Sequence, residues 1–196
     1  MAKRPATRNR EETLNRIYSE CIELSSEVGL DGLRAEEIAK RCKISRPLLN
    51  HYFPDDLKAS LRQFLIARVL EDFRAYIDKS LEGLTDPDQV LETYVKSHFE
   101  WARRKRAHFS VLLSFFPQCV NDADLRKANT QSVEAGLRRI ELLLAYRVKK
   151  KAAIPALARS FQIFLTGAII SHFTENDGAN RASNPEQLVM KYLNSF

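Results

Sequence analysis

The chain has 196 residues, of which 44% are apolar and 29% charged, and its formal net charge is +6. This length fits one domain or a small domain fused to a larger one, with enough apolar residues for a buried core. Only six glycines occur, and the composition favours helices over strands. Because no uninterrupted apolar run reaches about 18 residues and the N-terminus is too polar for a signal peptide, we expect a cytoplasmic protein without a membrane segment.

The first third of the chain reads as a short arm followed by three helices. Residues 1–9 are basic and polar, and we expect them to form a disordered arm. From Arg10 onward, apolar side chains recur every three or four positions, as in an amphipathic helix, and Gly29 offers a left-handed stop. Two short helices are then predicted over residues 34–42 and 45–52.

The rest of the chain reads as longer helices. After the break at Pro54, the apolar spacing and the turn residues predict five further helices and a short closing one. Their expected ranges are 56–81, 90–105, 108–116, 122–150, 156–174 and 185–196. We find no strand alternation and no internal repeat. The predicted fold class is therefore all-α, with about nine helices: three small ones that form a helix-turn-helix domain (10–54), then a helical bundle for regulation and dimerisation (55–196).

The two short helices and the turn at Lys43 form a helix-turn-helix candidate. Ser45 is a good N-cap, and Pro47 falls in the first turn, where its missing N–H costs nothing. Leu49 can pin the second helix, so that Arg46 projects from its N-terminal end. There Arg46 could fork onto guanine or clamp a phosphate. The alternative is a surface hairpin of helices that merely packs.

The same stretch resembles the N-terminal DNA-binding domain of the TetR family of bacterial transcriptional regulators, over roughly residues 10–65. The most specific residues are Glu37-Ile38-Ala39, Ile44-Ser45-Arg46 and His51-Tyr52-Phe53-Pro54. The resemblance implies a homodimer with one recognition helix per subunit in successive major grooves of palindromic double-stranded DNA. It also implies a bundle cavity for a small-molecule effector, whose identity the sequence does not give. Our hypothesis is a repressor that the effector releases; activation remains the alternative.

By position, the resemblance also assigns DNA contacts to individual residues. They are Arg34, Lys43, Ser45, Arg46, Pro47, Leu48, Asn50, His51, Tyr52 and Lys58. The sequence departs from the family pattern at three places: Lys43 replaces a glycine, Asn50 a tyrosine and Asp56 a lysine. Asn50 and Asp56 support a second hypothesis, a helical interaction module of the same fold without sequence-specific DNA binding.

The bundle contains candidates for a ligand pocket and for a dimer contact. Tyr94, His98 and Trp101 share one helix face, where a histidine could orient a ligand or could simply bond a carbonyl in the core. The predicted pocket residues are Tyr94, His98, Trp101, Leu112, Phe116, Gln131 and Phe161. Residues 156–174 are apolar on more than one face, so either a second copy covers one face or both are internal. The predicted dimer residues are Ile163, Phe164, Gly167, Ile170 and Ser171.

Other chemistry finds little support in the sequence. Cys21, Cys42 and Cys119 lack metal-ligand spacing and are predicted to be reduced, mostly core thiols. The histidines show no HxxxH or HExxH pattern, and no phosphate loop or paired catalytic carboxylates occur. We therefore expect no metal, no cofactor and no enzymatic activity. The basic runs at 103–106 and 147–151 complement helix dipoles, with an anionic effector or partner as the alternative.

Overall fold

The computed structural model describes residues 5–54, 56–174 and 184–195. This part of the chain contains helices and no strand, which confirms the predicted all-α class. The α-helices are α1 (Pro5–Val28), α2 (Ala35–Arg41), α3 (Arg46–Tyr52), α4 (Leu57–Leu81), α5 (Pro87–Arg104), α6 (Arg106–Gln118), α7 (Ala123–Leu144), α8 (Ile154–Thr174) and α9 (Pro185–Leu193). Two short 3-10 helices, η1 (Leu30–Gly32) and η2 (Lys151–Ala153), lie in the connections.

The contacts divide the chain into two compact units. The first comprises Met1–Asp72 and Arg106–Gln118, and the second comprises Phe73–Lys105 and Cys119–Phe196. Helix α4 passes unbroken from the first unit into the second. The two units defined by contacts therefore differ from the two predicted functional domains, which meet after residue 54. That functional boundary stays a prediction.

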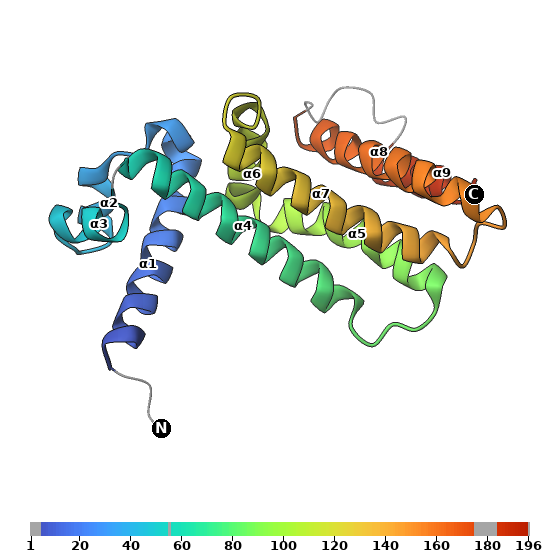
Figure 1. Ribbon diagram of the computed structural model, residues 1–196, viewed down its shortest axis with the longest axis horizontal. Helices are drawn as coiled ribbons and strands as arrows, with labels where there is room; N and C mark the ends of the chain where they lie inside the picture. Colours follow the sequence, from blue (N-terminus) through green and yellow to red (C-terminus); the bar gives the residue numbers. More distant parts are fainter. Residues whose placement is uncertain (1–4, 55, 175–183, 196) are drawn as a thin grey trace. The chain divides into compact units, whose positions relative to one another are not determined.

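In the first unit, α1, α2, α3, α6 and the first part of α4 surround a small apolar core. Helices α2 and α3 lie next to each other (Figure 1), and α1 packs against both α2 and α6. Ile17, Cys21, Leu49 and Leu65 are completely buried in this core. Each comes from the apolar face of its helix, as the spacing of the sequence predicts.

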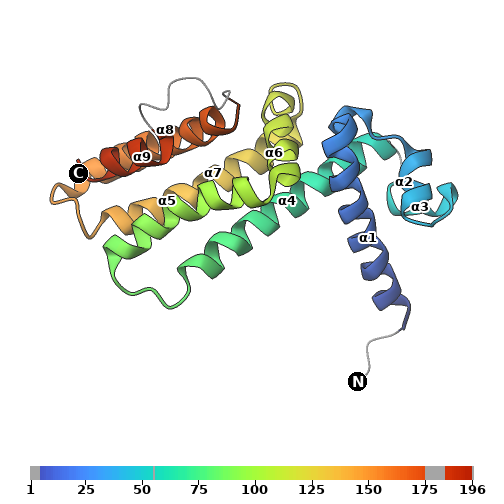
Figure 2. The same cartoon turned by 180° about the vertical axis from the view of Figure 1, so that it is seen from behind.

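In the second unit, α5, α7, α8 and α9 pack against one another (Figure 2). The largest side chains of this core, Phe99, Trp101 and Phe161, are almost completely buried. Helix starts are set locally: the side chains of Asp86, Asp122 and Asn184 each accept a backbone N–H at the start of α5, α7 and α9.

The structure corrects two predicted helix ends. Helix α1 begins at Pro5, so residues 5–9 of the expected disordered arm are helical, while residues 1–4 lie outside the described residues. Proline suits a first helical turn, and adding residues to an existing helix costs little. Helix α7 ends at Leu144, not near residue 150. There the Nε of Arg147 lies 2.6 Å from Asp88 Oδ1, and Val148 turns into the core, so tertiary contacts end the helix.

Smaller differences concern α6 and the cysteines. Helix α6 continues through Pro117 to Gln118, two residues beyond the predicted stop, and the side-chain amide of Gln118 donates to the Ser114 carbonyl at 2.7 Å. All three cysteines are buried thiols that form no disulfide, which confirms that prediction. Burial raises the pKa of the Cys21 thiol to about 12 and that of Cys42 to about 11. The predicted polar loop before α9 falls at residues 175–183, outside the described residues.

Candidate nucleic-acid interface and ligand cavity

The turn between α2 and α3 depends on one left-handed residue. Lys43 has φ 52° and is the only non-glycine residue with a positive φ in the described ranges. The turn is closed by the Ile44 N–H, which donates to the Ala39 carbonyl at 3.0 Å. A left-handed lysine costs roughly 1–2 kcal/mol, and its side chain is exposed. The strain therefore brings a cationic group to the surface beside α3.

Helix α3 starts with its N-terminal end open to solvent. Ser45 Oγ accepts the Leu48 N–H at 3.3 Å, and Pro47 occupies the first turn. This cap leaves the first turn regular, with the side chains of Arg46 (61% exposed) and Leu48 outside the core. A helix end that projects an arginine is the geometry with which helix-turn-helix proteins reach base edges.

The opposite face of α3 is pinned in the core. Leu49 is completely buried, and the ring of Phe53 lies 5.4 Å, centroid to centroid, from Phe64 of α4. Because residues 100° apart on a helix face different ways, this anchoring leaves Asn50 and His51 exposed. The residues by which α3 is buried in the core therefore determine which of its residues face the solvent.

Glu36 holds the arginine at the tip of α3. Its Oε1 lies 2.6 Å from Arg46 Nη1, and both side chains are mainly exposed. Such an exposed pair contributes little stability, but it orients the guanidinium. The closeness of Glu36 and Arg46 across the turn could not be deduced from their spacing in the sequence.

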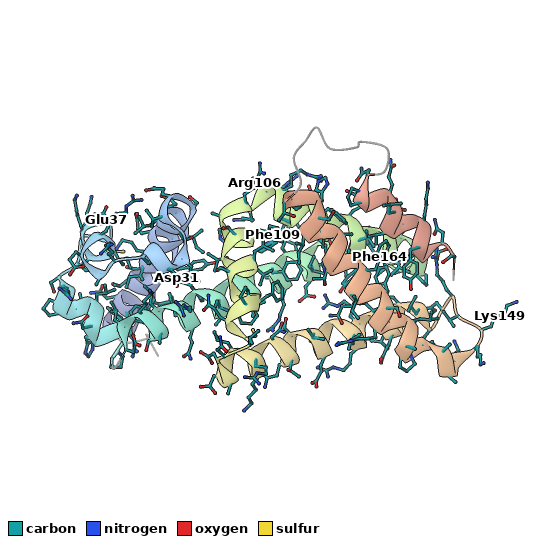
Figure 3. The ribbon with its side chains drawn as sticks, turned by 90° about the horizontal axis from the view of Figure 1, so that it is seen from above. Asp31, Glu37, Arg106, Phe109, Lys149 and Phe164 are labelled. Carbon is teal, nitrogen blue, oxygen red and sulfur yellow. The ribbon has the colours of Figure 1, made fainter. Side chains whose placement is uncertain are left out.

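A second ion-pair network fastens α2 to α1. The guanidinium of Arg41 donates to both carboxylate oxygens of Glu27, at 3.0 and 2.7 Å, and to Glu37 at 3.2 Å. The hydrogen bonds from Arg41 hold the pKa of Glu27 below its usual value. Arg41 is therefore engaged inside the protein and acts as a brace for α2 (Figure 3 labels Glu37 on this helix).

The start of α4 explains one departure from the family pattern. Asp56 Oδ1 accepts the backbone N–H groups of Lys58 and Ala59, at 2.9 and 3.1 Å, so this acid caps the helix. Lys58 is exposed, with its Nζ 3.9 Å from Asp31. Arg34 is exposed at the N-terminal boundary of α2. These two cations flank the outward face of α3 along the chain.

The second unit contains a cavity of about 110 Å³ between α4, α5 and α7. Its lining consists of Phe73, Arg74, Ile77, Asp78, Tyr94, His98, Ser132, Ala135, Gly136 and Arg139. The ring centroids of Phe73 and Tyr94 lie 5.0 and 4.4 Å from that of His98. Trp101 lies behind Phe73 in an edge-to-face contact, with ring centroids 4.8 Å apart.

His98 is a neutral hydrogen-bonding group in this cavity. Burial lowers the pKa of His98 to about 4. Its Nδ1 lies 2.6 Å from the Tyr94 carbonyl oxygen, which can only accept, so Nδ1 carries the proton. Nε2 is then an acceptor. Burial also raises the pKa of Tyr94 to about 12, so its hydroxyl stays protonated.

The structure brings together two of the seven predicted pocket residues. Tyr94 and His98 line the cavity, whereas Trp101 lies one layer behind it. Phe161 is buried in α8, Gln131 is exposed on α7, and neither belongs to this lining. Leu112 and Phe116 belong to α6, which is part of the first unit.

Sequence reasoning missed most of the lining, in particular Phe73, Arg74 and Asp78 on α4 and Arg139 on α7. Positions 73, 74, 77 and 78 follow helical spacing, but that signal is the same for a core face.

Helix α8 presents an apolar face to solvent. Ile163 is 62% exposed, and Phe164, labelled in Figure 3, is also exposed although its ring contacts Tyr192 at 5.1 Å. Gly167 is exposed, and a Cβ placed there would meet no atom within 4 Å. Of the other predicted dimer residues, Ile170 and Ser171 are half-buried.

The apolar character of α8 is also visible in its length and composition. Lys151–Thr174 has a mean hydropathy of 1.5 and could cross a membrane by those two criteria, and 28% of that stretch is buried. The search for uninterrupted apolar runs missed this because charged residues interrupt the stretch. Core helices of soluble proteins meet the same criteria.

Residues 17–56 match the family described as bacterial regulatory proteins, tetR family, and these residues span the second half of α1, all of α2, the turn at Lys43 and all of α3. The HTH-type transcriptional regulator BetI of Burkholderia ambifaria (strain MC40-6) is 27% identical over 148 residues, covering 73% of this chain and 75% of that protein. The helix-turn-helix domain of this chain is therefore a TetR-family DNA-binding domain. The chain is accordingly a transcriptional regulator that carries such a domain.

Two solved structures show that the TetR-like fold extends over nearly the whole chain. A transcriptional regulator from Saccharomonospora viridis, in complex with choline, has a TM-score of 0.81 at 16% identity and covers 94% of this chain and 96% of that one. A regulator from Rhodococcus sp. Rha1 has a TM-score of 0.78 at 14% identity, with coverages of 93% and 94%. At these identities the likeness concerns the fold.

Proposed function

We propose that this TetR-family protein is a cytoplasmic, ligand-responsive repressor that binds a palindromic operator as a homodimer and leaves it when a small-molecule effector binds. The observation that carries the proposal is the exposed N-terminal end of α3, where Arg46 and Leu48 project from a helix anchored by Leu49. Two such ends, held roughly 34–36 Å apart in a dimer, would enter successive major grooves.

The roles proposed at the DNA follow from exposure and from position on α3. Arg46, Pro47 and Leu48 occupy the leading turn, and we assign them to base edges. The residues assigned to the phosphate backbone or to support of α3 are Arg34, Lys43, Ser45, Asn50, His51, Tyr52 and Lys58. Of these seven, all but Tyr52 are exposed. Tyr52 is half-buried, with its ring 6.1 Å from that of His51, and fits a supporting role.

The proposed dimer contact is the exposed face of α8 together with α9. Ile163 and Phe164 provide apolar area, and the open space at Gly167 lets another helix approach closely. Leu188 of α9 extends the same apolar character. A second copy of the chain would remove this surface from water, which gives α8 a reason for its high hydropathy.

The proposed coupling between effector and DNA uses helix α4. This helix carries Lys58 near one end and lines the cavity with Phe73 and Asp78 near the other. A ligand that binds one arrangement of the cavity helices more tightly would shift the population toward it, and the spacing of the two α3 ends with it. The choline complex of the Saccharomonospora viridis regulator supports a small-molecule site in a protein of this fold.

The test is DNA binding by fluorescence anisotropy, on sites selected from genomic fragments and on random sequence. We expect Arg46→Ala to weaken binding to the selected site by roughly 1–3 kcal/mol and to relax its sequence preference. The matched control is Arg138→Ala, an exposed arginine of α7, which should leave binding unchanged. Equal affinity and equal salt dependence for Arg46→Ala and wild type would refute the assignment.

A wild-type protein that is not retained on random DNA even at low salt would favour the second hypothesis, a helical interaction module without sequence-specific DNA binding. The observation that supports this second hypothesis is Asp56, an acid where the family pattern has a lysine.

A further inference from the structure

The cavity between α4, α5 and α7 has more positive than negative charge in its lining. Arg74 lines it and has no ion-pair partner among the residues that the structure describes. Asp78 lies one turn further along α4 and would be the usual partner of Arg74. It is held instead by Arg139 of α7. The lining therefore has two guanidinium groups against one carboxylate, and the guanidinium of Arg74 is available.

The inner wall of the cavity is aromatic and uncharged. Phe73 and Tyr94 flank His98, with ring centroids 5.0 and 4.4 Å from it. His98 donates its one proton from Nδ1 to the Tyr94 carbonyl, so Nε2 remains as an acceptor without a partner in the described part of the chain. The Tyr94 side chain is buried, and its hydroxyl likewise makes no hydrogen bond to a described residue. Two polar groups in a mostly apolar wall are typical of a small-molecule site.

We infer that this cavity binds a small organic anion: a carboxylate whose body is a single ring or a short apolar chain. The carboxylate would lie beside Arg74 and Arg139, because a guanidinium fork matches a carboxylate in geometry and charge. The apolar body would lie against Phe73 and Tyr94, and a hydroxyl on it would donate to Nε2 of His98. This inference rests on the proposed ligand-responsive function and names the chemical class of its effector.

The size of the cavity limits the ligand. An engineered cavity of about 150 Å³ holds benzene, and the cavity here measures about 110 Å³. Because this enclosed space is smaller than one that holds benzene, a single ring would already fill it, and the carboxylate would lie outside it, at the opening where Arg74 is exposed. Fused rings and long acyl chains are too large.

The same charges distinguish this cavity from a site for a quaternary ammonium such as choline. Aromatic faces attract cations, and the rings of Phe73 and Tyr94 alone would fit such a ligand. Here the rings lie beside an unpaired guanidinium, and the only carboxylate of the lining is already engaged by Arg139. Repulsion between like charges then favours an anion over a cation of equal size.

The experiment measures ligand binding to the full chain without DNA, so that its result is independent of operator binding. Trp101 is the only tryptophan and makes an edge-to-face contact with Phe73 of the cavity wall, so its fluorescence reports occupancy. Calorimetric titration gives a second readout. The probes are benzoate, 4-hydroxybenzoate, the neutral benzamide and choline. The variants are Arg74→Gln and, as matched control outside the lining, Arg138→Gln.

We expect saturable binding of benzoate, tighter binding of 4-hydroxybenzoate, at least tenfold weaker binding of benzamide, and none of choline up to about 10 mM. Arg74→Gln should weaken benzoate binding about tenfold, which corresponds to roughly 1.4 kcal/mol, and leave benzamide unchanged. Arg138→Gln should match wild type. The inference is overturned if choline binds as tightly as benzoate, if Arg74→Gln has no effect on benzoate, or if no carboxylate probe binds. Operator binding that persists in those cases would leave the proposed DNA-binding function intact.

Discussion

Replacing Lys43 by glycine should make the protein more stable and a weaker DNA binder at the same time. Lys43 holds φ 52° in the turn before α3. Glycine adopts this conformation without strain, which should raise the free energy of unfolding by roughly 1–2 kcal/mol. The greater freedom of glycine in the unfolded chain should lower it by about 0.4–1 kcal/mol. The net expectation for Lys43→Gly is about 0.5–1 kcal/mol of added stability, measured as the free energy of unfolding in urea by circular dichroism.

The same substitution removes an exposed ammonium from the edge of the helix-turn-helix. If Lys43 neutralises one phosphate, the slope of log K against log salt should become shallower by about 0.9. Affinity at low salt should fall accordingly, measured by anisotropy on a selected operator.

The variant Lys43→Ala separates the effect of Lys43→Gly on stability from its effect on DNA binding. Alanine keeps the Cβ and therefore the strain, but it lacks the charge. It should lose the DNA contact without gaining stability. An unchanged salt slope in both variants would show that Lys43 does not contact phosphate, and an unchanged stability of Lys43→Gly would refute the strain argument.

Three further outcomes are expected. Glu36→Gln should free Arg46 and remove a like charge near the phosphates, raising affinity for random DNA up to about fivefold; anisotropy on random duplexes checks this, and a loss of affinity would contradict it. Ile163→Asp should shift the dimer to monomer in sedimentation velocity, whereas Leu142→Asp, an equally exposed leucine on α7 (69%), should not. Burial lowers the pKa of His98 to about 4, so the unfolded chain binds a proton that the folded one does not between about pH 6.5 and 4. Stability should fall as pH decreases through that window, and His98→Gln should fall less steeply in pH-dependent urea unfolding.

The helix-turn-helix could be predicted from the sequence because its signals are local. Ser45 caps α3 through a contact three residues away, and the left-handed turn at Lys43 is closed between neighbouring residues. Such contacts depend little on the rest of the chain. The apolar spacing of α8 likewise predicted more than one apolar face, because helix geometry converts a sequence pattern directly into faces, but it left open whether both faces are internal.

The end of α7 and the cavity lining could not be predicted in this way. Helix-forming residues continue past Leu144, yet the helix ends there, and Arg147 contacts Asp88, 59 residues away in the sequence. The pairing of Asp78 with Arg139 instead of Arg74 also joins two helices that are distant in sequence. By itself, the sequence determined the helices, their apolar and polar faces, and the helix-turn-helix. Only the tertiary structure decided which charges pair across helices, because such pairing depends on distances in space that no spacing along the chain encodes.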